Sequence, residues 1–238
     1  MPSPAEVRAV LFDYGRTLVT FEYPSAELSA VMERYRPAIA AATGRPAPEA
    51  ADILARVLMP LEAVIENPDE NEVEYLDIYK DAWRGAGWAL PDDLLYEILD
   101  AEQQVWDRAA RPDGEAVEVL EWLGERGFRR AICSNAPFPP AMMLRQLQTN
   151  GIAGLVDAAV FSSQIGRRKP AAQAYLAALE AVGVEASNAL FVGDRMREDY
   201  DGPRAVGMQA VICTAHAATP PPDGVPTIAS IGALRRLL

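Results

Sequence analysis

The fold of this chain is decided by the stretch VRAVLFDYGRTL at residues 7–18. It opens with an apolar run, Val7–Phe12, which ends at Asp13 and gives way to a polar loop. The shortness of the run and its branched side chains favour a buried strand over a helix. Four later apolar runs are expected strands for the same reason, at Arg129–Ser134, Ala158–Phe161, Ala189–Val192 and Gln209–Cys213.

Helical segments alternate with these later strands. Apolar residues recur at three- and four-residue spacing in Glu115–Arg126, Ala141–Gln148, Ala171–Ala181 and Tyr200–Val206. Alternation of strand and helix indicates a parallel sheet with helices on both faces. The fold class is therefore expected to be α/β, with a doubly wound, Rossmann-like core that the first strand joins.

A long helical block separates the first strand from this alternating part. Helical periodicity marks Ser25–Ala42, Pro48–Ile65, Asn71–Gly85 and Pro91–Trp106, and the block from Pro24 to Arg111 contains no convincing strand. Pro37 and Pro60 are expected to kink or shorten their helices. We therefore expect a core domain formed by residues 1–20 and 112–238, with an all-helical insert at residues 21–111.

Composition narrows the class of protein. The chain has 238 residues, with 22 Lys and Arg against 34 Asp and Glu, a formal charge of −12, and half of its residues are hydrophobic. This composition is globular, and the acidic balance argues against a nucleic acid or an anionic membrane as a partner. No apolar run approaches the ~20 residues that span a bilayer, and the N-terminus lacks the features of a signal peptide.

Cysteine, histidine and lysine are rare. Cys133 and Cys213 lie in expected strands, which argues against a disulfide framework and predicts a reducing, cytoplasmic location. The one histidine, His216, lies in a loop, so a histidine base or a histidine-rich zinc site is disfavoured. The only lysines are Lys80 and Lys169.

Polar residues follow the first four expected strands, and ligands of open parallel sheets bind at the carboxyl ends of the strands. These residues are Asp13 and Thr17, Ser134 and Asn135, Lys169, and Asp194 and Asp199. Neighbouring carboxylates repel one another unless a cation lies among them, and hard oxygen ligands select Mg²⁺. An ammonium and a hydroxyl can hold phosphoryl oxygens, while an in-line carboxylate attacks phosphorus to give an aspartyl phosphate. Neither GxxxxGK[ST] nor a GxGxxG first turn is present, which disfavours those nucleotide-binding folds.

The polar residues after the strands, with the sequences around them, resemble the four motifs of the haloacid dehalogenase superfamily, which fall in order within residues 9–213. The motifs are Leu11–Leu18, Cys133–Asn135, Lys169–Pro170 and Phe191–Met208. The fourth is the most specific, because both of its aspartates and its trailing Gly-Met fit the family pattern. The resemblance implies that residues 21–111 form the helical cap domain that many members insert between the first and second motifs.

The resemblance also implies a role for each motif residue. Asp13 would be the nucleophile, and Thr17, Ser134 and Lys169 would bind the phosphoryl group. The neighbours of these residues, Asn135 and Arg16, are expected to contact the substrate, with Arg16 adding positive charge. The expected Mg²⁺ ligands are Asp13, the backbone carbonyl of Gly15, Asp194 and Asp199. The implied activity is a Mg²⁺-dependent phosphatase that acts on a small phosphorylated metabolite.

One departure from the family pattern concerns the general acid. Phosphatases of the superfamily usually carry a second aspartate two residues after the nucleophile, where this chain has Gly15. Glycine keeps the carbonyl that serves the metal, but leaving-group protonation should lose about 10²–10⁴-fold. Tyr14, Tyr200 and His216 could stand in for the acid, although each is expected to be structural or to face solvent.

Alternatives follow from the same departure. Haloacid dehalogenases also lack the second aspartate, but they need no metal and usually lack the Gly-Asp pair of the fourth motif. A phosphonate or acyl-phosphate hydrolase would tolerate Gly15, and so would a binding or regulatory member with weakened turnover. In the helical insert, Trp83, Trp88 and Trp106 fit helix-packing positions and are expected in its core.

Overall fold

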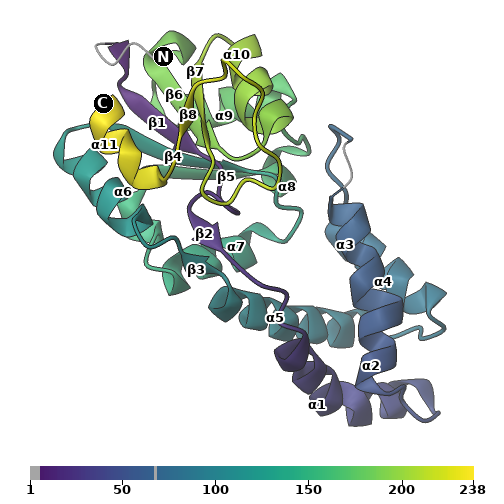
Figure 1. Ribbon diagram of the computed structural model, residues 1–238. Coiled ribbons are helices and arrows are strands. Elements are labelled where there is room, and N and C mark those ends of the chain that lie inside the picture. The colour runs from purple at the N-terminus through teal and green to yellow at the C-terminus, as the bar shows by residue number, and fades with distance from the viewer. Residues whose placement is uncertain (1–5, 67–68) are drawn as a thin grey trace.

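The computed structural model describes residues 6–66 and 69–238, and within them six strands form one parallel sheet in the order β5-β4-β1-β6-β7-β8 (Figure 1). The strands are β1 (Ala9–Phe12), β4 (Arg129–Ser134), β5 (Ala158–Phe161), β6 (Ala189–Gly193), β7 (Gln209–Cys213) and β8 (Thr227–Ile228). The doubly wound α/β fold and its five expected strands are confirmed. The two-residue β8 was not expected, because so short a strand has no periodicity.

The alternation of side chains along β1 builds the two faces of the sheet. Val10 and Phe12 join one apolar cluster, which includes Leu120, whereas Ala9 and Leu11 join a second cluster on the other face. Helices cover both faces because successive strand residues point to opposite sides. These helices are α6 (Ala116–Glu125), α7 (Pro140–Thr149), α8 (Ser162–Ile165), α9 (Ala172–Val182), α10 (Gly202–Ala205) and α11 (Leu234–Leu237). Short 3₁₀ turns lie at Ala153–Leu155, Ala186–Asn188 and Ile231–Ala233.

A helical insert leaves the sheet after β1 and has its own apolar cluster, around Trp83 and Ile98. Its helices are α1 (Ser25–Thr43), α2 (Ala50–Ile53), α3 (Met59–Ile65), α4 (Tyr75–Gly85) and α5 (Asp92–Ala109). The chain leaves and returns through an antiparallel pair, β2 (Val19–Thr20) and β3 (Arg111–Pro112), which the sequence did not indicate. The exact division into two domains stays a prediction.

The two helical prolines behave differently. Pro37 lies inside helix α1, which continues to Thr43, so Pro37 does not shorten this helix. Glu33 and Pro37 are both exposed, so water can satisfy the carbonyl that proline leaves without a donor. Pro60, by contrast, opens α3 directly after the π-helical turn Leu54–Leu58, which divides the expected helix Pro48–Ile65.

The fourth-motif helix also departs from its expected start. A π-helical turn at Met196–Asp201 precedes α10, so the helical segment begins four residues earlier than the periodicity indicated. Asp199 lies in this turn, and its buried carboxylate accepts the backbone N–H groups of Asp194 and Arg195. Such a contact is invisible to hydrophobic periodicity.

Two sets of contacts attach the insert to the sheet. Helix α5 packs on α7, where Arg145 forms ion pairs with Asp100 at 2.5 Å and Asp107 at 2.6 Å. Across the molecule, the segment before α4 reaches the loop after α8, and Arg168 pairs with the buried Glu72 at 3.3 Å. The insert therefore closes over one edge of the sheet (Figure 1). No helix in the described part of the chain combines the length and apolar character needed to cross a membrane.

Glu102 is a buried acid inside the insert. The Tyr79 hydroxyl donates a hydrogen bond of 2.6 Å to its carboxylate. Burial raises the pKa of Glu102 to about 8; the Tyr79 hydrogen bond opposes this shift and the charge of Glu62 adds to it. The folded protein therefore holds a proton that the unfolded chain releases at its ordinary pKa, 4.5.

Because the folded pKa is raised, the contribution of protonated Glu102 to stability is fully present below pH 4.5 and is lost as pH rises through about 8. Glu102→Gln keeps a neutral group there. We expect this variant to melt at least about 5 °C above the parent at pH 9, and near it at pH 4.5. Thermal unfolding by circular dichroism at the two pH values measures this. Glu97→Gln, an exposed change on the same helix, is the control. A difference in melting temperature between Glu102→Gln and the parent that does not change with pH would contradict the raised pKa of Glu102.

Candidate active site

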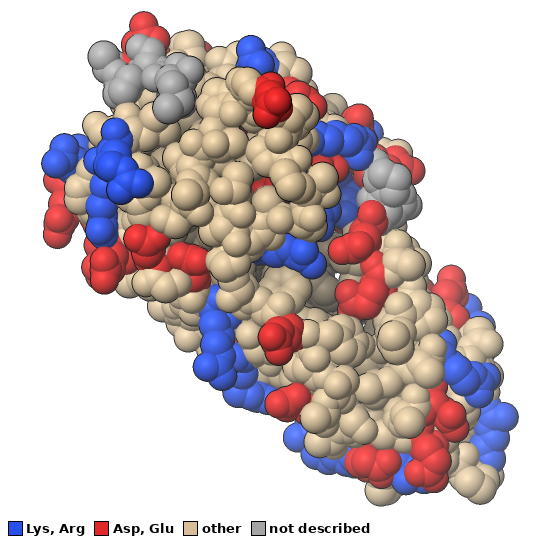
Figure 2. Space-filling model, viewed as in Figure 1, with Lys and Arg blue, Asp and Glu red and all other residues tan. Residues whose placement is uncertain are grey.

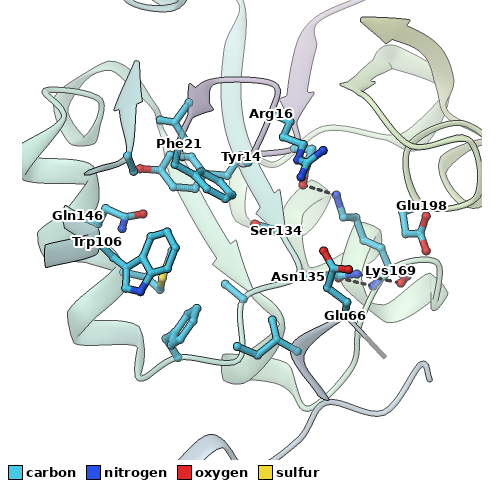
Figure 3. Close-up of a pocket in the computed structure, with 18 of the residues that line it drawn as sticks. Tyr14, Arg16, Phe21, Glu66, Trp106, Ser134, Asn135, Gln146, Lys169 and Glu198 are labelled. Carbon is cyan, nitrogen blue, oxygen red and sulfur yellow. Dashed lines mark hydrogen bonds and ion pairs between the residues drawn. The ribbon is translucent and has the colours of Figure 1, made fainter. Parts of the chain in front are cut away.

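The ammonium of Lys169 occupies the centre of the site, at the carboxyl edge of the sheet (Figure 3). Its Nζ lies 2.7 Å from Oδ1 of Asp13, which follows β1, and 2.7 Å from Oδ1 of Asp199, which follows β6. Lys169 is only 3% exposed. Burial disfavours the ammonium, but the charges of Asp13 and Asp199 outweigh it and raise the pKa of Lys169. Lys169 is therefore a fixed positive charge beside the predicted nucleophile.

Asn135 holds the backbone of Lys169. The Asn135 Oδ1 accepts the Lys169 N–H at 2.7 Å, and its Nδ2 donates to the Lys169 carbonyl at 3.1 Å. Asn135 was predicted to contact the substrate, and it does line the same cavity. Its amide nevertheless has two protein partners already, so its evident task is to fix the lysine.

Asp199 is fully engaged by the protein. One oxygen binds Lys169, and the other accepts the N–H groups of Asp194 at 3.0 Å and Arg195 at 2.9 Å. A Cβ at Gly193 would lie 2.3 Å from the Asp199 Cγ, so only glycine lets the strand end approach this carboxylate. Asp199 was predicted as a metal ligand, and here both of its oxygens have protein partners.

Three carboxylates gather around the one ammonium. Asp13, Asp194 and Asp199 each offer an oxygen, and these oxygens lie within 4.8 Å of one another. The Asp194 Oδ1 is buried without a hydrogen-bond partner in the described chain. Burial, with the charges of Asp13 and Asp199, raises the pKa of Asp194 to about 7. A buried, unpartnered carboxylate oxygen in an excess of negative charge fits a hard divalent cation such as Mg²⁺.

The loop after Asp13 is tightly wound. The Arg16 N–H donates to the Val19 carbonyl at 2.7 Å, and Arg16 adopts a left-handed φ of 60°, which costs about 1–2 kcal/mol for a residue with a side chain. Gly15 does not share this constraint. A Cβ at Gly15 would lie 3.5 Å from the Phe21 ring, an ordinary contact.

The other predicted phosphoryl-binding residues have different environments. Ser134, at the end of β4, is 8% exposed and lines the cavity. The Thr17 hydroxyl is buried and has no hydrogen-bond partner among the residues described, and Thr17 does not line the cavity. Arg16 lines the cavity, and within residues 6–66 and 69–238 its guanidinium forms neither an ion pair nor a hydrogen bond.

A cavity of about 220 Å³ lies between the sheet and the insert, and the site residues that line it are Asp13, Arg16, Ser134, Asn135, Lys169 and Asp199. Figure 2 shows this face hollowed there, with basic side chains on the sheet side and acidic ones on the insert side. Figure 3 shows two halves: Arg16, Lys169 and Asn135 on one side, and the rings of Phe21 and Trp106 on the other.

Sequence analysis missed most of the second half. Trp106, expected in the helical core, lines the cavity and meets the Phe21 ring edge-on at 5.8 Å. Phe138 and Arg195 line the cavity as well. Phe21 could have been suspected because it closely follows the first motif, whereas helical spacing does not distinguish a cavity wall from a core position for Trp106.

Each of the three possible substitutes for the missing acid has a hydrogen-bond partner in the protein. His216 is exposed and lies 2.8 Å from Asp113, and Tyr200 accepts a hydrogen bond from Arg204. Tyr14 does line the cavity, but its hydroxyl accepts a hydrogen bond from Asn150, and burial raises the pKa of Tyr14 to about 12. A phenol with so high a pKa is a weak acid at neutral pH.

Comparisons with known proteins identify the family of this chain. Residues 7–207 match the family model of haloacid dehalogenase-like hydrolases. A ribulose-1,5-bisphosphate 5-phosphatase from Halopiger xanaduensis is 34% identical over 41% of this chain and 40% of its own length, and a phosphoglycolate phosphatase from Rhodospirillum rubrum is 34% identical over 50% and 46%. The chain thus spans less than half the length of these two curated relatives. A glyceraldehyde 3-phosphate phosphatase from Methanopyrus kandleri is 26% identical over 86% of this chain and 83% of its own length.

Solved structures show the same fold in two kinds of enzyme. A HAD phosphatase from Thermococcus onnurineus superposes with a TM-score of 0.64, and a 2-haloacid dehalogenase from Pseudomonas syringae with 0.68. Each is 20% identical, with 97% of both chains covered. The match over residues 7–207, together with this fold, shows that the chain belongs to the haloacid dehalogenase-like hydrolases.

Proposed function

We propose that the chain is a Mg²⁺-dependent phosphatase that cleaves a small phosphorylated metabolite through a phosphorylated Asp13. One observation carries the proposal: Asp13 faces the cavity with the Lys169 ammonium 2.7 Å away, beside the unpartnered Oδ1 of Asp194. The curated relatives named above are phosphatases, which supports the same reaction class.

In this proposal Asp13, Asp194 and the Gly15 carbonyl hold Mg²⁺, which when bound supplies positive charge to the phosphoryl oxygens. Asp199 differs from its sequence prediction, since both of its oxygens are taken by Lys169 and by backbone N–H groups. We assign Asp199 to positioning Lys169. The unpartnered Asp194 Oδ1 also ranks a metal-independent dehalogenase below the phosphatase.

The reaction has two steps. The Asp13 carboxylate attacks phosphorus, the bond to the ester oxygen breaks, and the alcohol leaves with the bonding electrons and takes a proton from water. Lys169 and Arg16 stabilise the charge on the phosphoryl oxygens, and the Ser134 hydroxyl donates a hydrogen bond to one of them. Water then attacks phosphorus, which releases phosphate and restores the carboxylate.

Replacement of the nucleophile tests this proposal. With Mg²⁺ present, Asp13→Asn is expected to reduce steady-state hydrolysis of an aryl phosphate by about 10³-fold or more, because an amide cannot attack phosphorus. Excess chelator is expected to stop the parent enzyme as well. Asp201→Asn, an exposed acid outside the cavity, is the control. Activity that survives both Asp13→Asn and chelation would refute the proposal, and 2-haloacid turnover under chelation would favour dehalogenation.

A second candidate is a binding member of the family with little turnover. The observation that favours it is the Phe21 ring beside Gly15, where no acid is available to protonate a leaving group.

Gly15→Asp distinguishes the two candidates. A Cβ there meets only ordinary contacts, so we expect the variant to fold. If general acid is what the site lacks, kcat for an alkyl phosphate should rise about 10²-fold, and less for an aryl phosphate that leaves without a proton. Gly15→Asn has the same size without the acid and serves as the control. Equal rates for the two variants would contradict the role assigned to this position.

Arg16 offers a separate test, because its backbone is strained and its guanidinium faces the cavity. Arg16→Gly and Arg16→Ala should each lower kcat/KM by about 10- to 100-fold, the worth of a charged hydrogen bond to phosphate. Only glycine relieves the left-handed φ, so we expect Arg16→Gly to be about 1 kcal/mol more stable than Arg16→Ala, or roughly 2–4 °C in melting temperature. Unchanged kcat/KM in both variants would remove Arg16 from the site.

A further inference from the structure

From the second half of the cavity we infer that the substrate is the phosphate monoester of a compact, apolar and uncharged group, with a single flat ring as its best fit. This inference rests on the proposed function, because it takes the phosphoryl group to lie against Asp13 and Lys169. The inference specifies the chemical class of the leaving group in the proposed reaction.

The wall opposite the charged half presents mainly apolar side chains, with Glu62, Gln103 and Gln146 beside them. The apolar side chains that line the cavity are Val19, Phe21, Ile65, Trp106, Ala110, Phe138 and Met143. Phe21 is 45% exposed although its ring meets Trp106 at 5.8 Å, in an edge-on contact. Apolar surface left open inside a cavity gains free energy when an apolar ligand covers it.

The apolar wall begins next to the reacting carboxylate. The Phe21 ring lies 3.5 Å from the position of a Cβ at Gly15, two residues after Asp13. Trp106 extends the wall from the insert (Figure 3), and Phe138, in the loop before α7, lines the same cavity. The part of the substrate nearest the ester oxygen therefore meets aromatic carbon instead of hydrogen-bonding groups.

The charges around this wall disfavour an anionic group on the substrate. Glu62 of α3 lines the cavity, and its carboxylate forms no hydrogen bond or ion pair with the residues that the structure describes. The other polar side chains on this side, Gln103 and Gln146, are neutral carboxamides. A substrate carboxylate placed near Glu62 would be repelled by it, whereas an uncharged group would not.

The cavity also limits size. Its volume of about 220 Å³ is below the ~300–1,000 Å³ typical of pockets for drug-sized ligands. A phosphoryl group with one ring is compact enough for such a space, whereas a nucleotide is not.

Binding of phosphonates tests the inference without requiring turnover, because a C–P bond has no ester oxygen to leave. Calorimetry on the full chain with Mg²⁺ would compare methylphosphonate, benzylphosphonate, phosphonoacetate and 2-aminoethylphosphonate. We expect benzylphosphonate to bind at least about tenfold more tightly than each of the others. Phe21→Ala should remove most of this preference and leave methylphosphonate binding unchanged, which also shows that the variant is folded. Leu144→Ala, an exposed apolar change outside the cavity, should alter nothing.

The outcomes separate this inference from the proposed function. Preference for benzylphosphonate that depends on Phe21 supports the substrate class, even if aryl phosphate is not hydrolysed in the same preparation. Equal binding of all four phosphonates overturns the class, even if aryl phosphate is hydrolysed. Tighter binding of 2-aminoethylphosphonate overturns it too, because Glu62 would then be recognising a cation.

Discussion

The rest of the site depends on one buried charge, the Lys169 ammonium between Asp13 and Asp199. A buried ammonium is costly unless carboxylates compensate it, and each carboxylate here would be costly without the ammonium. Asp199 can serve because two backbone N–H groups share its other oxygen and Gly193 lets the strand end come close. Asn135 fixes the lysine backbone from the neighbouring strand, so three strand ends are tied to one charge.

The same centre connects the sheet to the helical insert. Arg168, the residue before Lys169, forms a buried ion pair with Glu72 of the insert, and the Arg168 N–H donates to the Glu70 carbonyl at 2.8 Å. Residues next to the charge therefore hold the insert in place, while Trp106 of α5 supplies part of the cavity wall. The sheet thus supplies the charged centre of the site, and the insert supplies part of the cavity wall. A ligand that contacts both must lie between the sheet and the insert.

Features that depend on a single strand or motif could be predicted from the sequence. Short apolar runs ending in polar residues predicted five strands, and a rare lysine marked Lys169. Sequence reasoning failed where a residue's surroundings come from distant parts of the chain. Trp106 has the spacing of a core residue, and only the position of α5 against the sheet makes it a cavity wall. Asp199 as a metal ligand stays a prediction, and its hydrogen bonds to Lys169, Asp194 and Arg195 were not visible in the sequence.

Gly15 and Phe21 are best understood together. Without a carboxylate at Gly15, a leaving group departs most easily when its own oxygen tolerates negative charge, as a phenolate does with a pKa near 10, like that of tyrosine. An aliphatic alkoxide is far more basic and needs a proton at the moment of cleavage. The Phe21 ring beside Gly15 favours a flat apolar group at the same place. The missing acid at Gly15 and the Phe21 ring therefore both favour an ester of an aromatic alcohol, which leaves without a proton from the protein.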